Sequence, residues 1–173
     1  MIGANELDGT TDCSIDAALA VVGDRWSILI LRDMFRGIRR FEEIQRDLGI
    51  PRAVLTDRLR RLVAAGVVER REYQQRPRRF EYRLTRMGVE LSPILVSLMH
   101  WGDRWLGDGD PPVQLVHRDC GTPVTLDYYC WECGTSYSPG DIRSAAPRSG
   151  ERGTEVSGDR RSSEKGSHGH HGN

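Results

Sequence analysis

The chain has 173 residues, of which 38% are hydrophobic and 29% are charged, and its formal net charge at pH 7 is zero. A chain of this length can bury one ordinary hydrophobic core, so we expect one main domain. Its longest aliphatic runs are far too short to cross a bilayer, and its amino terminus lacks the basic and apolar regions of a secretory signal. The sequence therefore predicts a cytoplasmic protein with no membrane partner.

Positive charge is concentrated in the middle of the chain. Residues 36–86 include fifteen arginines, no lysine and seven acids, which leaves a local net charge of +8. A basic segment of this kind is typical of a nucleic-acid-binding surface. The neutral average over the whole chain therefore does not argue against a DNA partner.

Helices are predicted on both sides of residue 40. Residues 14–36 have apolar side chains at helical spacing, and Gly23 divides them into a short helix and a longer buried one. A second short helical segment opens at Arg40 and ends at Gly49, where a glycine can leave the helical conformation.

A further helix is predicted over residues 51–65. Pro51 suits its first turn, because the missing N–H of proline would have no helical partner there. Leucines at the i, i+4 and i+7 positions are expected to face the core, and Gly66 ends the helix. The core leucines are Leu55, Leu59 and Leu62, and the opposite face carries Ala53, Thr56, Asp57, Arg60 and Ala64, with Arg61 on its flank.

After this helix the apolar period changes from helical to two. Residues 67–73 and 79–84 alternate well enough for two antiparallel strands. The turn between them, residues 74–78, is rich in arginine and contains Pro77, which cannot join a central ladder. The pattern predicts a hairpin with a basic tip.

The next predicted helix extends to Trp105. Thr85 is suited to cap it, and Pro93 must either kink the helix or mark its true start with Ser92 as the cap. Trp101 and Trp105 lie one turn apart among leucines. Together they form a wider apolar surface than a small domain covers by itself.

The order of these elements predicts a fold that is mainly α with a small β-hairpin. A short helix, a tight turn and a helix with a small polar face form a helix-turn-helix, and the basic hairpin makes it winged. Such a helix fits the major groove of duplex DNA, while arginines on the hairpin meet phosphates or the minor groove. The predicted groove residues are Arg52, Ala53, Thr56, Asp57 and Arg60, and those of the wing are Arg76, Arg78 and Arg79. Arg58 and Arg61 rank lower, because either could pair with Asp57 or Glu43.

These elements resemble those of a known family. A cysteine, then GDRWSILILRDMFRGIRRFEEIQRDLGIPRAVLTDRLRRLVAAGVVERREY and RPRRFEYRLTRMGVEL, are similar over residues 13–106 to the HxlR family of MarR-like winged helix-turn-helix regulators. Ser14 stands where a proline is usual. The resemblance implies a bacterial, homodimeric DNA-binding transcriptional regulator with a recognition helix over residues 51–65, a wing over residues 67–84 and a dimer interface made by its terminal helices.

Cys13 precedes the first predicted helix. At the amino end of that helix, the helix dipole would lower the pKa of its thiol and favour the thiolate. The family resemblance implies a sensor of electrophiles or oxidants, and hence a response to a small-molecule effector. The alternative is a small, half-buried hydrophobic residue with no signalling role.

A second group of cysteines follows the predicted winged helix. Their spacing is H-x2-C-x9-C-x2-C, and two such pairs can supply the closed tetrahedral shell of a structural zinc ion. A reduced dithiol with an unrelated cysteine and histidine is the alternative, and Asp119 or Asp127 could replace the histidine as fourth ligand. The predicted ligands are His117, Cys120, Cys130 and Cys133.

The remaining segments complete the predicted organisation. We expect a flexible amino terminus, residues 1–12, a DNA-binding and dimerisation domain, residues 13–106, and a linker, residues 107–112. A zinc-ribbon-like module over residues 113–142 precedes a tail, residues 143–173, whose few apolar side chains predict disorder. The ending HGHHGN has a metal-binding composition but is expected to be solvated.

Two other classes of function compete with DNA binding. We expect no enzyme, because no nucleophilic triad or glycine-rich phosphate loop is present and His100, in an apolar helix, is better explained as a packing residue. A zinc-dependent protein-interaction module built on a winged helix is the alternative function. The concentration of arginine on the predicted helix and hairpin favours DNA.

Overall fold

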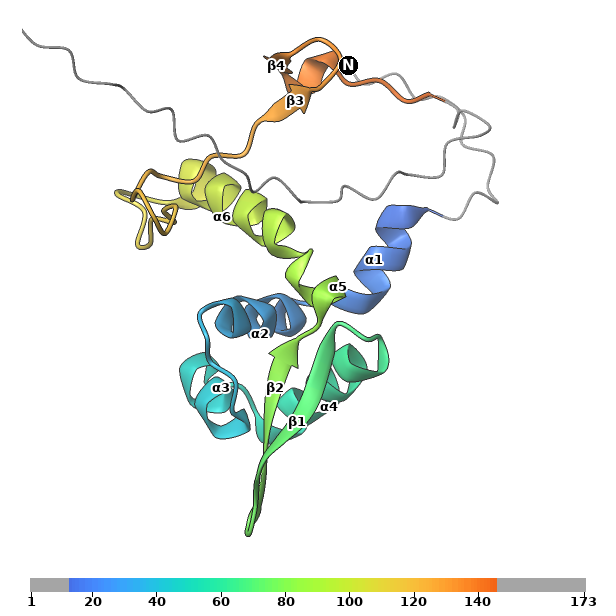
Figure 1. Cartoon of the computed structure of the whole chain (residues 1–173), viewed down its shortest axis with the longest axis vertical. Coiled ribbons are helices and arrows are strands. Elements are labelled where there is room, and N and C mark those ends of the chain that lie inside the picture. The colour runs from blue at the N-terminus through green and yellow to red at the C-terminus, as the bar shows by residue number, and fades with distance from the viewer. Residues whose placement is uncertain (1–12, 146–173) are drawn as a thin grey trace, which may run out of the picture. The chain divides into compact units, whose positions relative to one another are not determined.

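The computed structural model describes residues 13–145. They fall into two compact units that divide between Leu126 and Asp127, inside the segment predicted as the zinc-ribbon-like module, and each unit is described by itself. The predictions for residues 1–12, for the HGHHGN ending and for most of the tail concern residues outside the described range. The helices and strands of the first unit are α1 (Ser14–Val22), α2 (Arg25–Phe35), α3 (Phe41–Leu48), α4 (Arg52–Ala64), β1 (Val68–Gln75), β2 (Arg78–Leu84), α5 (Arg86–Val89) and α6 (Ser92–Leu106) (Figure 1).

The predicted break between the first two helices is confirmed. Asp24 has an extended backbone and caps α2, where its Oδ1 accepts hydrogen bonds from the backbone N–H groups of Trp26 at 3.0 Å and Ser27 at 3.1 Å. The Ser27 hydroxyl donates to the second carboxylate oxygen. A capped start of this kind fixes where α2 begins.

Helices α3 and α4 form the predicted helix-turn-helix. Gly49 ends α3 with φ of 59°, in the left-handed region that glycine adopts without a steric cost. Pro51 is the last extended residue before α4, which begins at Arg52. The turn between the helices is therefore set by one glycine and one proline. Pro51 has an extended ψ of 137° and occupies the N-cap position, so the prediction that it lies in the first turn of the helix is wrong by one residue.

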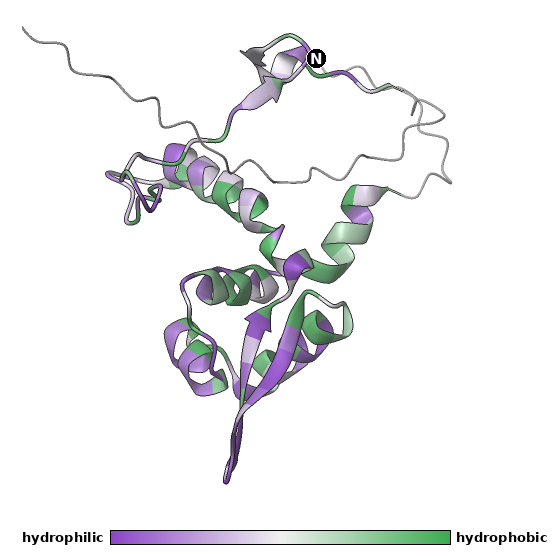
Figure 2. Cartoon of the chain, viewed as in Figure 1, coloured by the Kyte–Doolittle hydropathy of each residue, from purple (hydrophilic) through white to green (hydrophobic). Residues whose placement is uncertain are grey.

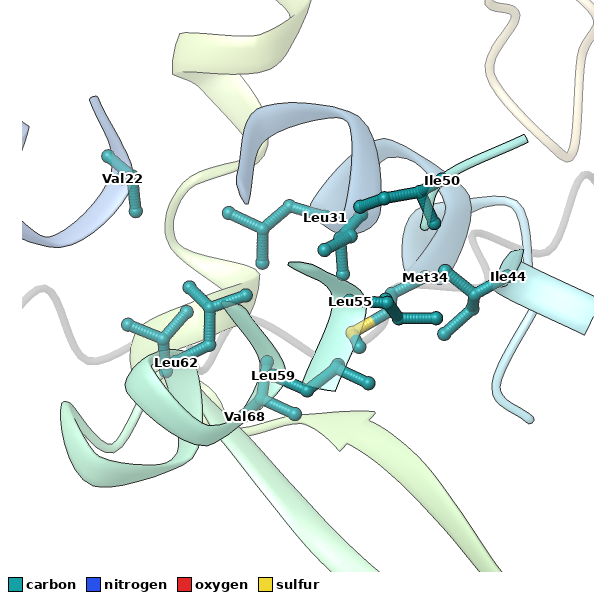
Figure 3. Close-up of a cluster of buried hydrophobic side chains, with 11 residues drawn as sticks. Val22, Leu31, Met34, Ile44, Ile50, Leu55, Leu59, Leu62 and Val68 are labelled. Carbon is teal, nitrogen blue, oxygen red and sulfur yellow. The ribbon is translucent and has the colours of Figure 1, made fainter. Parts of the chain in front are cut away.

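The core lies where α2, α3, α4 and the start of β1 meet (Figure 3). The prediction that the α4 leucines are buried is confirmed, since none of the three is more than 1% exposed. Fully buried aliphatic side chains of this size stabilise a fold by about 1.5–3 kcal/mol each. The core side chains that are almost fully buried are Ile30, Leu31, Ile44, Ile50, Leu55, Leu59, Leu62, Val67 and Val68.

A buried carboxylate joins α2 to α3. Asp33 is inaccessible to solvent, and its Oδ1 lies 2.7 Å from Arg32 Nη2 and 3.3 Å from Arg36 Nη1. The same two guanidinium groups reach Asp47 of α3 at 3.1 and 3.0 Å. Burial raises the pKa of Asp33, although the hydrogen bond from Arg32 opposes the shift. This four-residue network holds α3 at a fixed angle beside α2.

The hairpin is longer than the sequence predicts. Its ladder runs from Val68 opposite Leu84 to Gln75 opposite Arg78, so only Arg76 and Pro77 remain in the turn. The register shifts between Glu72 and Gln74, which indicates a bulge at the extra residue on β1. This bulge allows pairing to continue past the predicted strand end.

The residues before α3 add to the hairpin. Arg40 forms an isolated bridge with Glu81, and the Tyr82 N–H donates to the Arg39 carbonyl at 2.8 Å. The hairpin is thereby tied to the start of the helix-turn-helix, which limits how far it can move relative to α4.

The single helix considered from Thr85 onward is two helices. Thr85 caps the short α5 by accepting from the Gly88 N–H at 3.2 Å. Leu91 and not Ser92 occupies the N-cap of α6, and Pro93 lies in its first turn. Proline cannot donate to a preceding helical turn, so the helix restarts there instead of continuing from α5.

Two helices leave apolar side chains uncovered. None of the residues of α6 is buried, and Trp105 is 63% exposed. Ile15 and Leu19 of α1 are also more than half exposed. Figure 2 shows hydrophobic residues along both helices, in contrast to the hydrophilic hairpin. The exposed apolar residues of α6 are Ile94, Leu98, Trp101, Trp105 and Leu106.

The second unit contains a short hairpin. Strand β3 (Tyr128–Cys130) pairs antiparallel with β4 (Thr135–Tyr137), and a single 3-10 turn, Pro139–Asp141, follows. The Ser138 N–H and hydroxyl both donate to Asp141, which caps that turn. Across the described residues of both units, no helix is long and apolar enough to span a bilayer.

Candidate nucleic-acid interface

The outer face of α4 forms a shallow hollow of about 580 Å³. All five predicted groove residues line it, so the structure brings them together on one surface. The Thr56 hydroxyl donates to the Arg52 carbonyl at 2.8 Å, which keeps that side chain close to the helix. Small side chains on this face leave the backbone of α4 accessible to a partner. The lining residues are Arg52, Ala53, Thr56, Asp57 and Arg60.

A larger groove of about 890 Å³ lies between α3, α4 and the hairpin. Of the predicted hairpin arginines, Arg78 and Arg79 line this groove, whereas Arg76 lies in the turn and does not. Six arginines and two glutamates line it, and this net positive charge attracts a polyanion. Its arginines are Arg40, Arg46, Arg52, Arg70, Arg78 and Arg79.

Aromatic side chains lie beside four of these arginines, including Arg78, whose Cζ atom is 5.6 Å from the Phe80 centroid. The Cζ atom of Arg52 lies 4.7 Å from the ring centroid of Phe41 at the start of α3. Arg70 stacks over Phe80 at 3.6 Å, from one strand of the hairpin to the other. Arg40 lies 4.9 Å from the Tyr73 ring. Contacts between a guanidinium and an aromatic face contribute about 0.5–1 kcal/mol at exposed sites, enough to bias a flexible side chain toward one direction.

The contributions of Arg40, Arg46 and Arg70 are not evident from the sequence interpretation, which assigned the interface to α4 and the hairpin tip. A signal for Arg70 was available. In the hairpin register, Arg70 is opposite Tyr82, and Glu72, two residues further along β1, is opposite Phe80. Residues two apart on a strand, and residues opposite each other, point to the same face, so Arg70, Tyr82 and Phe80 share one face of the hairpin. Arg40 and Arg46 depend on the placement of α3 beside the hairpin, a tertiary relation.

Asp57 is the centre of a charge network on α4. Its Oδ1 lies 2.8 Å from Arg60 Nη2, and its Oδ2 lies 2.8 Å from Arg61 Nε. Arg58 Nη1 is 3.9 Å from the same carboxylate, while Arg58 Nε lies 3.2 Å from Asp24 of the α2 cap. The pairing of Arg58 and Arg61 with Asp57 is one of the two options that the sequence left open. Glu43, the other option, lies near Arg40 instead.

The hairpin has a corresponding carboxylate. Glu72 of β1 accepts hydrogen bonds from Arg78 of β2, with Nη2–Oε2 at 2.8 Å and Nε–Oε1 at 3.4 Å. The hydrogen bond from Arg78 lowers the pKa of Glu72, and the same interaction raises the pKa of Arg78. Each of the two elements predicted to contact DNA therefore has an acid that pairs with its own arginines.

Comparison with known proteins identifies the family. Residues 21–110 match the HxlR-like helix-turn-helix family. The chain belongs to the HxlR family. An uncharacterized HTH-type transcriptional regulator of Mycobacterium tuberculosis (strain ATCC 25618 / H37Rv) is 46% identical to it over 122 residues, which are 70% of this chain and 77% of the relative. YybR, an uncharacterized HTH-type transcriptional regulator of Bacillus subtilis (strain 168), is 37% identical over 92 residues, which are 53% of this chain and 74% of YybR. This HxlR-family chain is thus a DNA-binding transcriptional regulator of the helix-turn-helix type.

Solved structures show the same fold. The crystal structure of PA1607, a candidate transcription factor, matches with a TM-score of 0.72 and 36% identity over 80% of this chain and 97% of PA1607. That share is larger than residues 21–110, so the similarity extends beyond the family match. HypR, a redox regulator, matches in its reduced form with a TM-score of 0.50 and 35% identity over 54% of this chain and 96% of HypR.

Cys13 occupies the amino end of α1, as the sequence predicts. It is the N-cap residue, and its backbone is extended with φ of −74° and ψ of 111°. The Ala17 N–H donates to the Cys13 carbonyl at 3.0 Å, which closes the first helical turn. The thiol is exposed instead of half-buried, so it is accessible to reagents in solution.

Each predicted zinc-ligand pair of this HxlR-family chain occupies a turn of the same design. In the first unit the Gly121 N–H donates to the His117 carbonyl at 2.8 Å, and in the second the Gly134 N–H donates to the Cys130 carbonyl at 2.8 Å. Both glycines have positive φ, 71° and 68° respectively. A glycine in the left-handed region therefore closes each of the two turns.

The side chains within each turn lie close together. His117 Nδ1 is 3.2 Å from Cys120 Sγ, and the Cys133 N–H donates to Cys130 Sγ at 3.4 Å. Hydrogen bonds with Thr122 and with His117 lower the pKa of Cys120 to about 7. Within residues 13–145, no three histidine, cysteine or acidic side chains are grouped as a metal site. Each turn thus holds a pair of potential ligands.

Proposed function

We propose that this HxlR-family regulator binds duplex operator DNA as a homodimer, with α4 in the major groove and the β1–β2 hairpin acting as a wing. The observation that supports this most directly is the arginine-lined groove between α3, α4 and the hairpin. A surface that joins an exposed helix to basic side chains on a neighbouring hairpin has the shape and charge of a winged-helix interface.

The two parts of this surface have different roles in the proposal. Arg52, Ala53 and Thr56 lie at the amino end of α4, the part of a recognition helix that contacts base edges. Arg76, Arg78 and Arg79 are exposed at the hairpin end and contact phosphates or the minor groove. Arginine suits both roles, because its planar group can bond to guanine or to a phosphate.

The homodimer explains the uncovered helices. Apolar side chains on α1 and α6 are exposed in one chain, and a second copy would remove them from water. Two recognition helices in one dimer would read two half-sites about one helical turn of DNA apart.

Two single substitutions test this function. The first step is to select, from a random library, duplexes that the wild-type protein retains, and to compare each with its scrambled sequence. Arg52→Ala should cost about 1–3 kcal/mol on the selected duplex and little on the scrambled one. Arg79→Ala should weaken binding to both and reduce the salt slope by about one. Retention of no duplex by the wild-type protein, or equal losses on both duplexes for both variants, contradicts the proposal.

A response to oxidants or electrophiles is proposed through Cys13. Its support is the exposed thiol at the N-cap of α1 and the similarity to HypR, which is described as a redox regulator. Treatment with a mild electrophile should change DNA affinity in the wild-type protein and not in Cys13→Ser, and an identical response in the two proteins removes the sensor role.

A structural zinc ion is proposed for His117, Cys120, Cys130 and Cys133. Its support is the H-x2-C-x9-C-x2-C spacing and the two glycine turns of matching geometry. Three thiolates and one imidazole complete a tetrahedral shell and leave no position for substrate, so the ion would stabilise the fold locally. Protein purified in reductant without chelator should contain about one zinc per chain, lost in Cys130→Ser. Zinc retained in His117→Ala assigns the fourth position to Asp119, Asp127 or water.

A further inference from the structure

We propose that Asp57 is a specificity-determining residue that lowers the affinity of the protein for DNA without the operator sequence. The inference rests on the proposed DNA-binding function and goes beyond it, since it assigns the carboxylate a role against wrong sequences. In this role Asp57 competes with phosphate for the arginines of α4, and it releases them where a base edge donates a hydrogen bond to the carboxylate.

The geometry of α4 carries the proposal. Asp57 is bonded at 2.8 Å on one oxygen to Arg60 and at 2.8 Å on the other to Arg61. The two arginine side chains are 77% and 63% exposed, so solvent and DNA reach them freely, whereas the carboxylate is only 31% exposed. Asp57 also lines the hollow on the outer face of α4, where a base pair would face it.

Arg58 lies between this network and the cap of α2. Its Nε lies 3.2 Å from Asp24, the cap of α2, and its Nη1 lies 3.9 Å from Asp57. Arg58 is therefore shared between two acids and is the least exposed of the three arginines. Among the described residues, Asp57 is therefore paired at short range only with Arg60 and Arg61, whose exposed side chains can turn outward.

On a random duplex the network opposes binding. An arginine that turns to a phosphate must leave Asp57, and the carboxylate then faces the negative backbone without its partner. An exposed ion pair is weak, so the penalty is modest for one arginine but applies on every non-operator sequence. Repulsion between like charges adds to it and suppresses wrong partners.

On the operator the same carboxylate gains a partner. The exocyclic amino group of cytosine in the major groove donates a hydrogen bond that aspartate can accept. The expected ligand chemistry at Asp57 is therefore a base-edge amino group, with Arg60 and Arg61 then free to bond to a guanine or a phosphate. The operator is therefore the sequence on which Asp57 lowers the DNA affinity least.

The test removes the negative charge of residue 57 and keeps the shape of its side chain. Asp57→Asn should bind the scrambled duplex about three- to tenfold more tightly, with a salt slope steeper by about one. Its affinity for the selected duplex should rise less or fall, so the ratio of the two affinities decreases. Asp57→Glu keeps the carboxylate and should keep the ratio near that of the wild-type protein. Thermal unfolding of both variants checks that the helix remains folded.

Two further variants separate local competition from overall charge. Glu90→Gln removes the same charge next to Arg86, on the segment that joins α5 to α6, and should leave both affinities nearly unchanged. Glu72→Gln frees Arg78 on the hairpin and should raise both affinities together, without a change in ratio. An unchanged ratio in Asp57→Asn, an equal gain in Glu90→Gln, or a loss of ratio in Asp57→Glu overturns the inference. If the wild-type protein retains no duplex, the proposed DNA-binding function is overturned instead.

Discussion

Helices α4 and α6 have similar apolar patterns, but the leucines of α4 are buried and those of α6 are largely exposed. Both carry leucines at helical spacing, α4 over 13 residues and α6 over 15. The leucines of α4 are at most 1% exposed, whereas Leu98 of α6 is 51% exposed and no residue of α6 is buried. Only the start of α6, through Leu91 and Leu95, packs against the core.

The difference shows that apolar periodicity predicts a buried face but not what covers it. Helix α4 is surrounded by α2, α3 and the hairpin of its own chain, which the short turns at Gly49 and Gly66 bring close. Helix α6 follows the short α5 and leaves the core after its first turns. Its apolar face is then available to another chain, as proposed for the homodimer.

The largest expected effect contrasts these two leucine-bearing faces directly. Leu59→Ala removes a fully buried side chain from the core and should lower the free energy of unfolding by about 2–5 kcal/mol. Leu98→Ala removes an exposed leucine of the same size and should change the unfolding of the isolated chain by less than about 0.5 kcal/mol. Urea unfolding at low protein concentration measures both, and equal losses would show that α6 is covered within one chain.

Much of the fold follows from local signals. Gly23, Gly49, Gly66 and Pro51 mark the helix ends, and the three leucines of α4 identify its buried side. At the hairpin tip, the predicted strand ends were wrong by two residues on β1 and one on β2, because a bulge is not visible in an alternating pattern. The division between α5 and α6 was left open, since Pro93 is compatible with a kink or a new start.

The candidate interface was predicted less completely than the fold. Helical periodicity places Arg52, Thr56 and Asp57 on one face, and the structure gathers them in one hollow. The aromatic partners that orient arginines, such as Phe41 for Arg52, come from other elements. Pairings between elements depend on tertiary packing, which a single helical or strand pattern does not contain.

The second prediction concerns the exposed apolar face of α6. Trp105→Ala should weaken the proposed dimer by about 2 kcal/mol, or roughly 30-fold in dissociation constant, because large aromatic residues often carry most of the energy of an interface. Sedimentation over a range of concentrations measures the change. Tyr73→Ala on the hairpin removes another exposed aromatic and is the control, which should leave the dimer intact. A wild-type protein that is monomeric at micromolar concentration while it binds a palindromic duplex as one unit would contradict the dimer.

The smallest effect tests whether the charged flank of α4 also contributes to the fold. Burial disfavours ionisation of Asp24, but its hydrogen bonds with Ser27 and the nearby Arg58 outweigh this, so its pKa is lowered from the ordinary value of 3.8. A lowered pKa means that the stabilisation is fully present above pH 3.8 and is lost as the pH falls through the pKa of the folded state.

Asp24→Ala should therefore cost about 1 kcal/mol at neutral pH, the usual contribution of a helix cap. Asp24→Asn can still cap α2 but cannot pair with Arg58 as an anion, so it should lose only part of this stability. The difference between the Asp24→Asn variant and the wild-type protein should shrink as the pH is lowered below 3.8, where the native carboxylate becomes protonated. Urea unfolding at stepped pH measures that difference. A gap that stays constant down to full acid unfolding would mean that the Asp24 charge contributes nothing, and that α4 is held in the fold by its leucines alone.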